Sequence, residues 1–207
     1  MSDALALIAH DLKNALGGLE GELSRLIDDP SPVMAQRAHL QCAELRRQFI
    51  QFLTLYGART EGLSPLCEDE SPQEVLTALH RVWSAKLKMD PHAISVELAS
   101  PLQAPAFWYF DHRLVRLALD AAIHNAVRFA RHRVTLDVRE EQGWLVWHVI
   151  DDGEGLGSLD PAQDNATGLG TALSEAVATA HKSHGRTGHI SLKPHAAQGT
   201  EFTMALP

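Results

Sequence analysis

Three polar residues near the N-terminus, in the stretch HDLKN, could carry phosphoryl chemistry. His10 and Asp11 are adjacent, and Asn14 follows His10 by four residues, which makes these side chains neighbours on one face of a helix. A carboxylate beside an imidazole can hold one ring nitrogen protonated and leave the other as a nucleophile. An amide could orient an incoming phosphoryl group, or a water that removes it. An ordinary solvated helix face would have the same letters, so both interpretations remain open on this stretch alone.

Two glycine-rich segments in the C-terminal half could form a nucleotide site. The first, DDGEG, places Asp151, Gly153 and Gly155 directly after an apolar stretch. A carboxylate there can accept a hydrogen bond from an exocyclic amine such as that of adenine, and glycines let the backbone approach a flat ring. The second, GLGTAL, places Gly168 and Gly170 at a helix start, where backbone N–H groups attract phosphate. Each segment alone is a weak signal, because glycine turns occur in every fold.

An asparagine in the stretch IHNAVRFA is a further candidate. Asn125 lies in the middle of a predicted helix, although asparagine is a mediocre helix former. Its amide oxygen could bind a magnesium ion held on phosphates. A surface asparagine of little energetic cost would give the same pattern.

Apolar spacing predicts the elements that position these residues. Residues 5–26 carry a coiled-coil-like apolar seam, and His10 lies away from this seam at a solvent-facing position. A second helical stripe runs over residues 34–56. The prolines of DDPSP, residues 28–32, separate the two helices because proline cannot continue a helix. We therefore expect an antiparallel helical hairpin that pairs with a second copy as a dimeric four-helix bundle. Packing of the hairpin on the rest of its own chain is the alternative.

The pattern changes after residue 62. Residues 63–71 are rich in turn formers and acid, which is typical of a linker. Beyond them we predict helices at 72–87, 111–130 and 172–181, and strands at 94–99, 133–138, 144–151, 189–194 and 199–207. The predicted class is α+β, with a helical hairpin domain over residues 1–62 and a two-layer α/β sandwich over residues 72–207.

Composition excludes several classes of function. Apolar residues make up 45% of the 207 residues, charged residues make up 21%, and the formal net charge is −8. The chain has no basic patch for nucleic acid and no apolar run long enough for a membrane span. Two isolated cysteines, Cys42 and Cys67, do not form a disulfide framework or a zinc site. We expect a reduced, cytoplasmic protein.

Taken in order, these segments resemble the catalytic core of bacterial sensor histidine kinases over essentially the whole chain. HDLKN resembles the phospho-acceptor box, AAIHNAVRFA the N box, and DDGEG and GLGTAL the two glycine boxes. FWYFDHRLVRLAL resembles the segment that leads into the N box, and the final Gly199 and Thr200 resemble the usual ending. No single segment is decisive, but together, in this order, they are strongly specific.

This resemblance implies a function and a role for each candidate residue. His10 would take the γ-phosphoryl group of ATP, with Asp11 as base and Asn14 aligning phosphate or water, and would pass it to a response-regulator receiver domain. Asn125 would hold Mg²⁺ on the nucleotide and Asp151 would bind adenine. The resemblance further assigns residues that shape the nucleotide site or contact its phosphate and adenine ends: Gly153, Gly155, Gly168, Gly170, Arg128 and Thr200.

The chain departs from the family pattern in four places. Ala15 stands where the acceptor box usually has proline, and Ala121 stands where the N box usually begins with a polar residue, with Asp120 one residue away. Thr171 replaces the last leucine of the second glycine box, and the lid segment, residues 156–167, is short. Because only nine residues precede His10, we expect the signal to arrive through a separate sensor protein.

Three functions therefore stay open. The first is an ATP-dependent histidine kinase. The second is a histidine phosphotransferase with a degenerate ATP site that relays phosphate between receiver domains. The third is a non-catalytic scaffold that binds a receiver domain.

Overall fold

The computed structural model describes residues 2–88, 94–156, 168–196 and 198–207. The chain divides into two compact units, residues 1–62 and 63–207, and each is described by itself. Of the predicted lid segment, residues 157–167 lie outside the described residues. Among the helices that the structure describes, none is long and apolar enough to cross a membrane.

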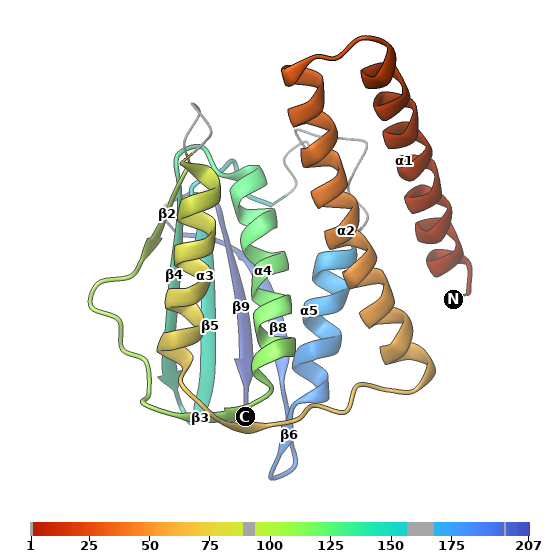
Figure 1. The fold of residues 1–207 in the computed structure, drawn as a ribbon. Coiled ribbons are helices and arrows are strands. Elements are labelled where there is room, and N and C mark those ends of the chain that lie inside the picture. The colour runs from red at the N-terminus through yellow and green to blue at the C-terminus, as the bar shows by residue number, and fades with distance from the viewer. Residues whose placement is uncertain (1, 89–93, 157–167, 197) are drawn as a thin grey trace. The chain divides into compact units, whose positions relative to one another are not determined.

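The first unit is a helical hairpin. Helix α1 (Ser2–Asp28) and helix α2 (Pro32–Thr60) run in opposite directions and pack along a shared apolar seam (Figure 1). The seam buries Leu12, Leu19, Ala38 and Leu45. Helix α2 begins two residues before the predicted stripe, because the Ser31 hydroxyl accepts a hydrogen bond from the Met34 N–H and Pro32, predicted as part of the break, occupies the first helical position.

The second unit is a two-layer α/β sandwich. Its five-stranded sheet has the order β2-β4-β5-β9-β8, with β2 parallel to β4 and every other pair antiparallel. The strands are β2 (Ser95–Leu98), β4 (Arg133–Glu141), β5 (Trp144–Asp151), β8 (His189–Pro194) and β9 (Thr200–Leu206). Helices α3 (Pro72–Leu87), α4 (His112–Phe129) and α5 (Leu169–Ala180) lie on one face of this sheet (Figure 1). The predicted α+β class is confirmed.

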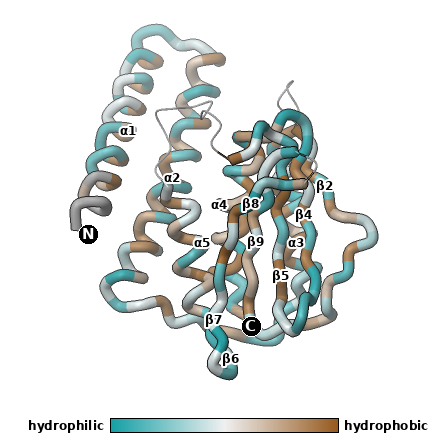
Figure 2. Tube along the Cα trace, turned by 180° about the vertical axis from the view of Figure 1, so that it is seen from behind, coloured by the Kyte–Doolittle hydropathy of each residue, from teal (hydrophilic) through white to brown (hydrophobic). Residues whose placement is uncertain are grey.

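Strand alternation places the core between the sheet and the helices. Along β4, the side chains of Val134, Leu136 and Val138 are fully buried, and polar residues alternate with them. Figure 2 shows this alternation of hydrophobic and hydrophilic residues along the strands seen from the far side. Trp147 of β5 is fully buried and meets Phe110 edge to face, with ring centroids 5.9 Å apart.

Several short strands are absent from the sequence prediction. Strand β1 (Glu68–Glu70) lies within the segment predicted as linker and pairs with β3 (Trp108–Phe110). Strands β6 (Lys182–Ser183) and β7 (Arg186–Thr187) form a small hairpin between α5 and β8. Strands of two or three residues are too short to show an alternating pattern.

A buried polar cluster joins β1, β3 and the ends of two helices. Asp111 caps α4 by accepting the backbone N–H groups of Arg113 and Leu114, and it also accepts the N–H of Leu66. The N–H of Asp111 donates to Nε2 of His181 at 3.0 Å, and Nδ1 of His181 lies 2.8 Å from the carbonyl oxygen of Val177. This arrangement requires the neutral imidazole with its proton on Nδ1.

Candidate functional site

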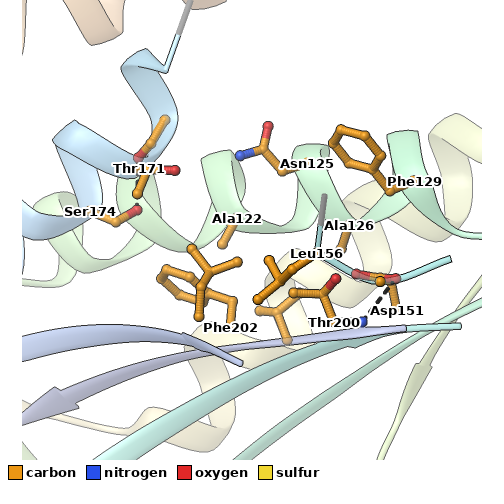
Figure 3. Close-up of a pocket in the computed structure, with 14 residues that line it drawn as sticks. Ala122, Asn125, Ala126, Phe129, Asp151, Leu156, Thr171, Ser174, Thr200 and Phe202 are labelled. Atoms are coloured by element: carbon orange, nitrogen blue, oxygen red, sulfur yellow. Dashed lines mark hydrogen bonds between the residues drawn. The ribbon is translucent and has the colours of Figure 1, made fainter. Parts of the chain in front are cut away.

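A cavity of about 230 Å³ opens between α4, α5 and the strands β5, β8 and β9 of the second unit. Figure 3 shows its lining residues pointing into it from the helices above and the sheet below. Five of the predicted site residues line it: Asn125, Asp151, Gly155, Gly170 and Thr200. Segments that are far apart in the sequence therefore meet around one space.

Asp151 provides a fixed carboxylate in this cavity. Its side chain is 6% exposed, and its Oδ1 accepts the backbone N–H groups of Gly153 at 2.9 Å and Thr200 at 3.2 Å. Burial raises the pKa of the Asp151 carboxyl above its ordinary value, and these two N–H groups offset only part of that effect. Both backbone N–H groups bind Oδ1, and the Thr200 hydroxyl also bonds the carboxyl. Oδ2 takes neither backbone bond and keeps acceptor capacity for an amine of a ligand.

At two positions beside Asp151, Gly153 and Gly199, the backbone packs too closely for any residue other than glycine. A Cβ at Gly153 would overlap the carbonyl oxygen of Phe129, and a Cβ at Gly199 would overlap the carbonyl oxygen of Asp151. Gly199 also has a φ of +96°, and Gly155 has a φ of +93°, which disfavour any side chain. The glycines of DDGEG thus act in different ways: Gly153 by close approach and Gly155 by conformation.

Asn125 lies on the exposed side of α4 at the cavity, directly beside the first turn of α5. A Cβ at Gly170 would lie 3.4 Å from Nδ2 of Asn125 and 3.5 Å from Cβ of Ala121. Ala121 is fully buried at this contact between helices. The neighbouring Asp120 is occupied elsewhere, since it accepts a hydrogen bond from the indole N–H of Trp83 at 2.9 Å.

Gly168 and Arg128 lie outside the cavity lining. Gly168 is the residue before α5, with a φ of +64°, and thus starts the helix in a left-handed conformation. Arg128 lies on α4 with its guanidinium 5.9 Å from the centre of the Phe129 ring.

Sequence reasoning assigned no site role to most of the cavity lining. The second aspartate of DDGEG, Asp152, was also given no role: its Oδ1 accepts the backbone N–H groups of residues 131, 132 and 133 and fixes the turn between α4 and β4. The lining residues without a predicted site role are Ala122, Ala126, Phe129, Val149, Leu156, Thr171, Ser174, Leu192 and Phe202. Most are apolar, and nothing in the sequence separates an apolar cavity residue from an apolar core residue.

The predicted phospho-acceptor residues belong to the first unit. The His10 side chain is 61% exposed, and its Nδ1 lies 3.6 Å from Oδ1 of Asp11 and 3.2 Å from the side-chain nitrogen of Asn14. The structure thus brings these three side chains together on an exposed face of α1.

Comparison with known proteins gives this geometry its context. Residues 110–207 match the family described as histidine kinase-, DNA gyrase B-, and HSP90-like ATPase. Every cavity-lining residue lies inside the matched range.

A known sensor protein matches part of this chain. The heme sensor protein HssS of Staphylococcus haemolyticus is 27% identical over 110 residues, which are 47% of this chain and 23% of HssS. This chain therefore matches about a quarter of the length of that relative.

Solved structures resemble the chain across both units. The Acinetobacter baumannii histidine kinase AdeS has a TM-score of 0.71 at 21% identity and covers 95% of this chain and 96% of its own. The histidine kinase ThkA, solved in complex with the response regulator TrrA, has a TM-score of 0.70 at 14% identity. The match covers 98% of this chain and 60% of the ThkA chain. The resemblance to histidine kinase cores that the sequence boxes indicated is confirmed, and at these identities the structures show the shared fold.

Proposed function

We propose that this protein is an ATP-dependent histidine kinase of a two-component system. The ATPase domain transfers the γ-phosphoryl group of ATP to His10, and His10 passes it to an aspartate of a response-regulator receiver domain. The observation that supports this most strongly is one chain that holds both a cavity with a fixed carboxylate and, in its other unit, an exposed histidine beside a carboxylate and an amide.

The cavity suits the adenine end of ATP. Its lining is mostly apolar, which favours a flat ring, and Asp151 accepts the exocyclic amine of that ring through Oδ2. Thr200 orients this carboxylate through its backbone N–H. Gly155, Gly168 and Gly170 shape the chain where it follows the nucleotide, and Arg128 is the cation of α4 that we assign to phosphate.

Asn125 suits a magnesium ion carried by the phosphates. Asn125 is exposed and lines the cavity, and an amide oxygen is a type of ligand that Mg²⁺ accepts. In the described parts of the chain, no cluster of three His, Cys, Asp or Glu residues could hold a metal. The ion would take its other ligands from phosphate and water, and it would neutralise charge on the transferring group.

At His10, the residues of α1 support a direct transfer. When the amide of Asn14 turns from Nδ1 to the phosphoryl oxygens, Asp11 holds the proton on Nδ1, so the lone pair of Nε2 attacks the γ-phosphorus. The Nε2–P bond forms as the bond to the bridging oxygen breaks, and ADP leaves with that electron pair. Asn14 orients the phosphoryl oxygens, or a water in the reverse direction.

The helical hairpin supports a homodimer. Large apolar side chains remain exposed beside the seam at Leu16, Leu23 and Ile27 of α1 and at Phe49, Leu53 and Tyr56 of α2. On α1 these residues continue the seam face and lie away from His10. Pairing of two hairpins along these stripes forms a four-helix bundle and leaves both His10 side chains in solvent.

The receiver domain is the proposed partner because ThkA, which shares the fold over both units, has been solved with a response regulator. A separate protein as the source of the signal, and a cytoplasmic location, stay predictions from the sequence.

Incubation of the purified chain with γ-labelled ATP and Mg²⁺ tests the proposal. We expect acid-labile label on the wild type, none on the H10A variant, and transfer of the label to a receiver domain. The alternative of a histidine phosphotransferase is favoured by one observation, the burial of Ala121, which leaves no polar side chain at that position. Label that reaches His10 only from a phosphorylated receiver domain would support that alternative, and receiver binding without label by either route would support a scaffold.

A further inference from the structure

Thr171 places a hydroxyl group in the cavity from the first turn of α5. It follows Gly170, whose Cα lies against Asn125 of α4, and both Thr171 and Asn125 line the cavity. Figure 3 shows Thr171 and Ser174 at one side of the cavity and Asp151 at the other. Thr171 and Asn125 therefore form a polar region opposite the carboxylate.

The two hydroxyl groups of α5 differ in their hydrogen bonding. Ser174 is 1% exposed, and its hydroxyl lies 3.0 Å from the carbonyl oxygen of Gly170 and 3.3 Å from that of Ala118. The Ser174 hydroxyl is therefore already hydrogen-bonded to the backbone of α4 and α5. Within the described residues, no hydrogen bond to the Thr171 hydroxyl is present, although this side chain is partly buried. A partly buried hydroxyl that lines a cavity is available to a ligand.

Charge determines which part of a nucleotide lies near Thr171. The Asp151 carboxylate repels phosphate, so the polyphosphate is favoured at the opposite side of the cavity. The first turn of α5 contains no acidic residue, and its backbone N–H groups give it partial positive charge. Thr171 and Asn125 are the polar side chains that line the cavity at that turn.

We propose that Thr171 is a positioning residue for the polyphosphate of ATP, with its hydroxyl donating to a phosphate oxygen beside Asn125. This inference rests on the proposed function, because it assigns the orientation of the nucleotide in the same cavity.

Titration of the full-length chain with ATP and Mg²⁺ by calorimetry tests the role of the hydroxyl. T171V keeps the shape and removes the hydroxyl, and T171S keeps the hydroxyl and removes the methyl group. We expect T171V to weaken ATP binding about tenfold and T171S to stay within about threefold of the wild type. T179V is the matched control, because Thr179 lies on the same helix, is exposed, and bonds its hydroxyl to the carbonyl oxygen of Glu175.

Competition by adenosine, which lacks phosphate, assigns the contact to one end of the nucleotide. We expect the adenosine affinity of T171V to equal that of the wild type. Equal losses for adenosine and ATP, equal losses for T171V and T171S, or no loss in T171V would each overturn the inference. If the wild type still binds ATP and D151N does not, the proposed function survives the failure of the Thr171 inference. Absence of ATP binding in the wild type would overturn both the Thr171 inference and the proposed function.

Discussion

Nδ1 of His10 lies 3.6 Å from the carboxylate oxygen Oδ1 of Asp11 on the exposed face of α1. Both contacts of the His10 ring given above, to Asp11 and to Asn14, are made by Nδ1. Nε2 is thus the ring nitrogen that meets an incoming phosphoryl group. The Asp11 carboxylate favours a proton on Nδ1 and a lone pair on Nε2, whereas the Asn14 amide nitrogen, a donor, binds Nδ1 only when Nδ1 is unprotonated. The reactive tautomer therefore requires the Asn14 amide to release Nδ1.

The D11N variant tests this relationship. An amide can donate to Nδ1 and so favours the opposite tautomer, which removes the lone pair from Nε2. We expect autophosphorylation of His10 to fall about a hundredfold, with ATP binding unchanged because Asp11 lies in the other unit. Label incorporation and calorimetry measure the two effects, and unaltered labelling of D11N would contradict the assigned role.

The buried carboxylate of Asp151 should lower the folding stability of the second unit at neutral pH. Burial raises the pKa of this carboxyl in the folded chain, so its contribution to stability falls as pH rises above the ordinary value of about 4. We expect D151N to melt at a higher temperature than the wild type at pH 7, and the difference to vanish near pH 3.

The same substitution should weaken nucleotide binding. In D151N the amide oxygen of the new side chain can still accept from Gly153 and Thr200, but its amide nitrogen then faces the amine of adenine as a second donor. We expect ATP affinity to fall about ten- to a hundredfold. A variant that is more stable and binds ATP normally would disprove adenine recognition by Asp151.

His181 should make the second unit sensitive to acid. Burial lowers the pKa of this imidazole, and its neutral form accepts the Asp111 N–H. Its contribution is complete above the unfolded pKa of about 6.5 and is lost as pH falls below that value, because the unfolded chain then binds the proton more readily. We expect H181Q to be less stable than the wild type at pH 7.5 and to lose less stability between pH 7.5 and pH 5, as measured by urea unfolding.

Glycines on the His10 face should weaken α1. Gly17 and Gly21 follow Asn14 at helical spacing, and a Cβ at either position would have no atom within 4 Å. Because glycine costs a helix about 1 kcal/mol relative to alanine, we expect G17A and G21A each to stabilise the hairpin by about that amount. Thermal unfolding of residues 1–62 within the full chain measures this, and a loss of stability would indicate that these positions are covered.

Gly153 should tolerate no side chain. A Cβ there overlaps the carbonyl oxygen of Phe129, so we expect G153A to destabilise the second unit by about 1–3 kcal/mol and to reduce ATP binding. G57A serves as the control, since a Cβ at Gly57 has no atom within 4 Å. Equal stability of G153A and G57A in urea would refute the close approach.

The sequence by itself determined the long helices, the strands of the main sheet and the order of the boxes. The apolar stripe through Leu12 and Leu19 and the prolines after Asp29 are local signals, and the hairpin follows from them. The alternation of apolar and polar residues in β4 and β5 predicted both strands, because successive side chains of a strand point to opposite faces of the sheet.

Only the tertiary structure decided how Asp151, Thr171 and Phe202 come to line one cavity. Their chain positions meet through the strand order and the packing of α5 on α4, and no local spacing contains that information. The same reason explains why β1 and the His181 contact to Asp111 went unpredicted: each depends on residues about 40 to 70 positions apart. Helices, strands and the His10 cluster depend on residues that are close in the sequence. A cavity depends on long-range contacts that form only when the chain folds.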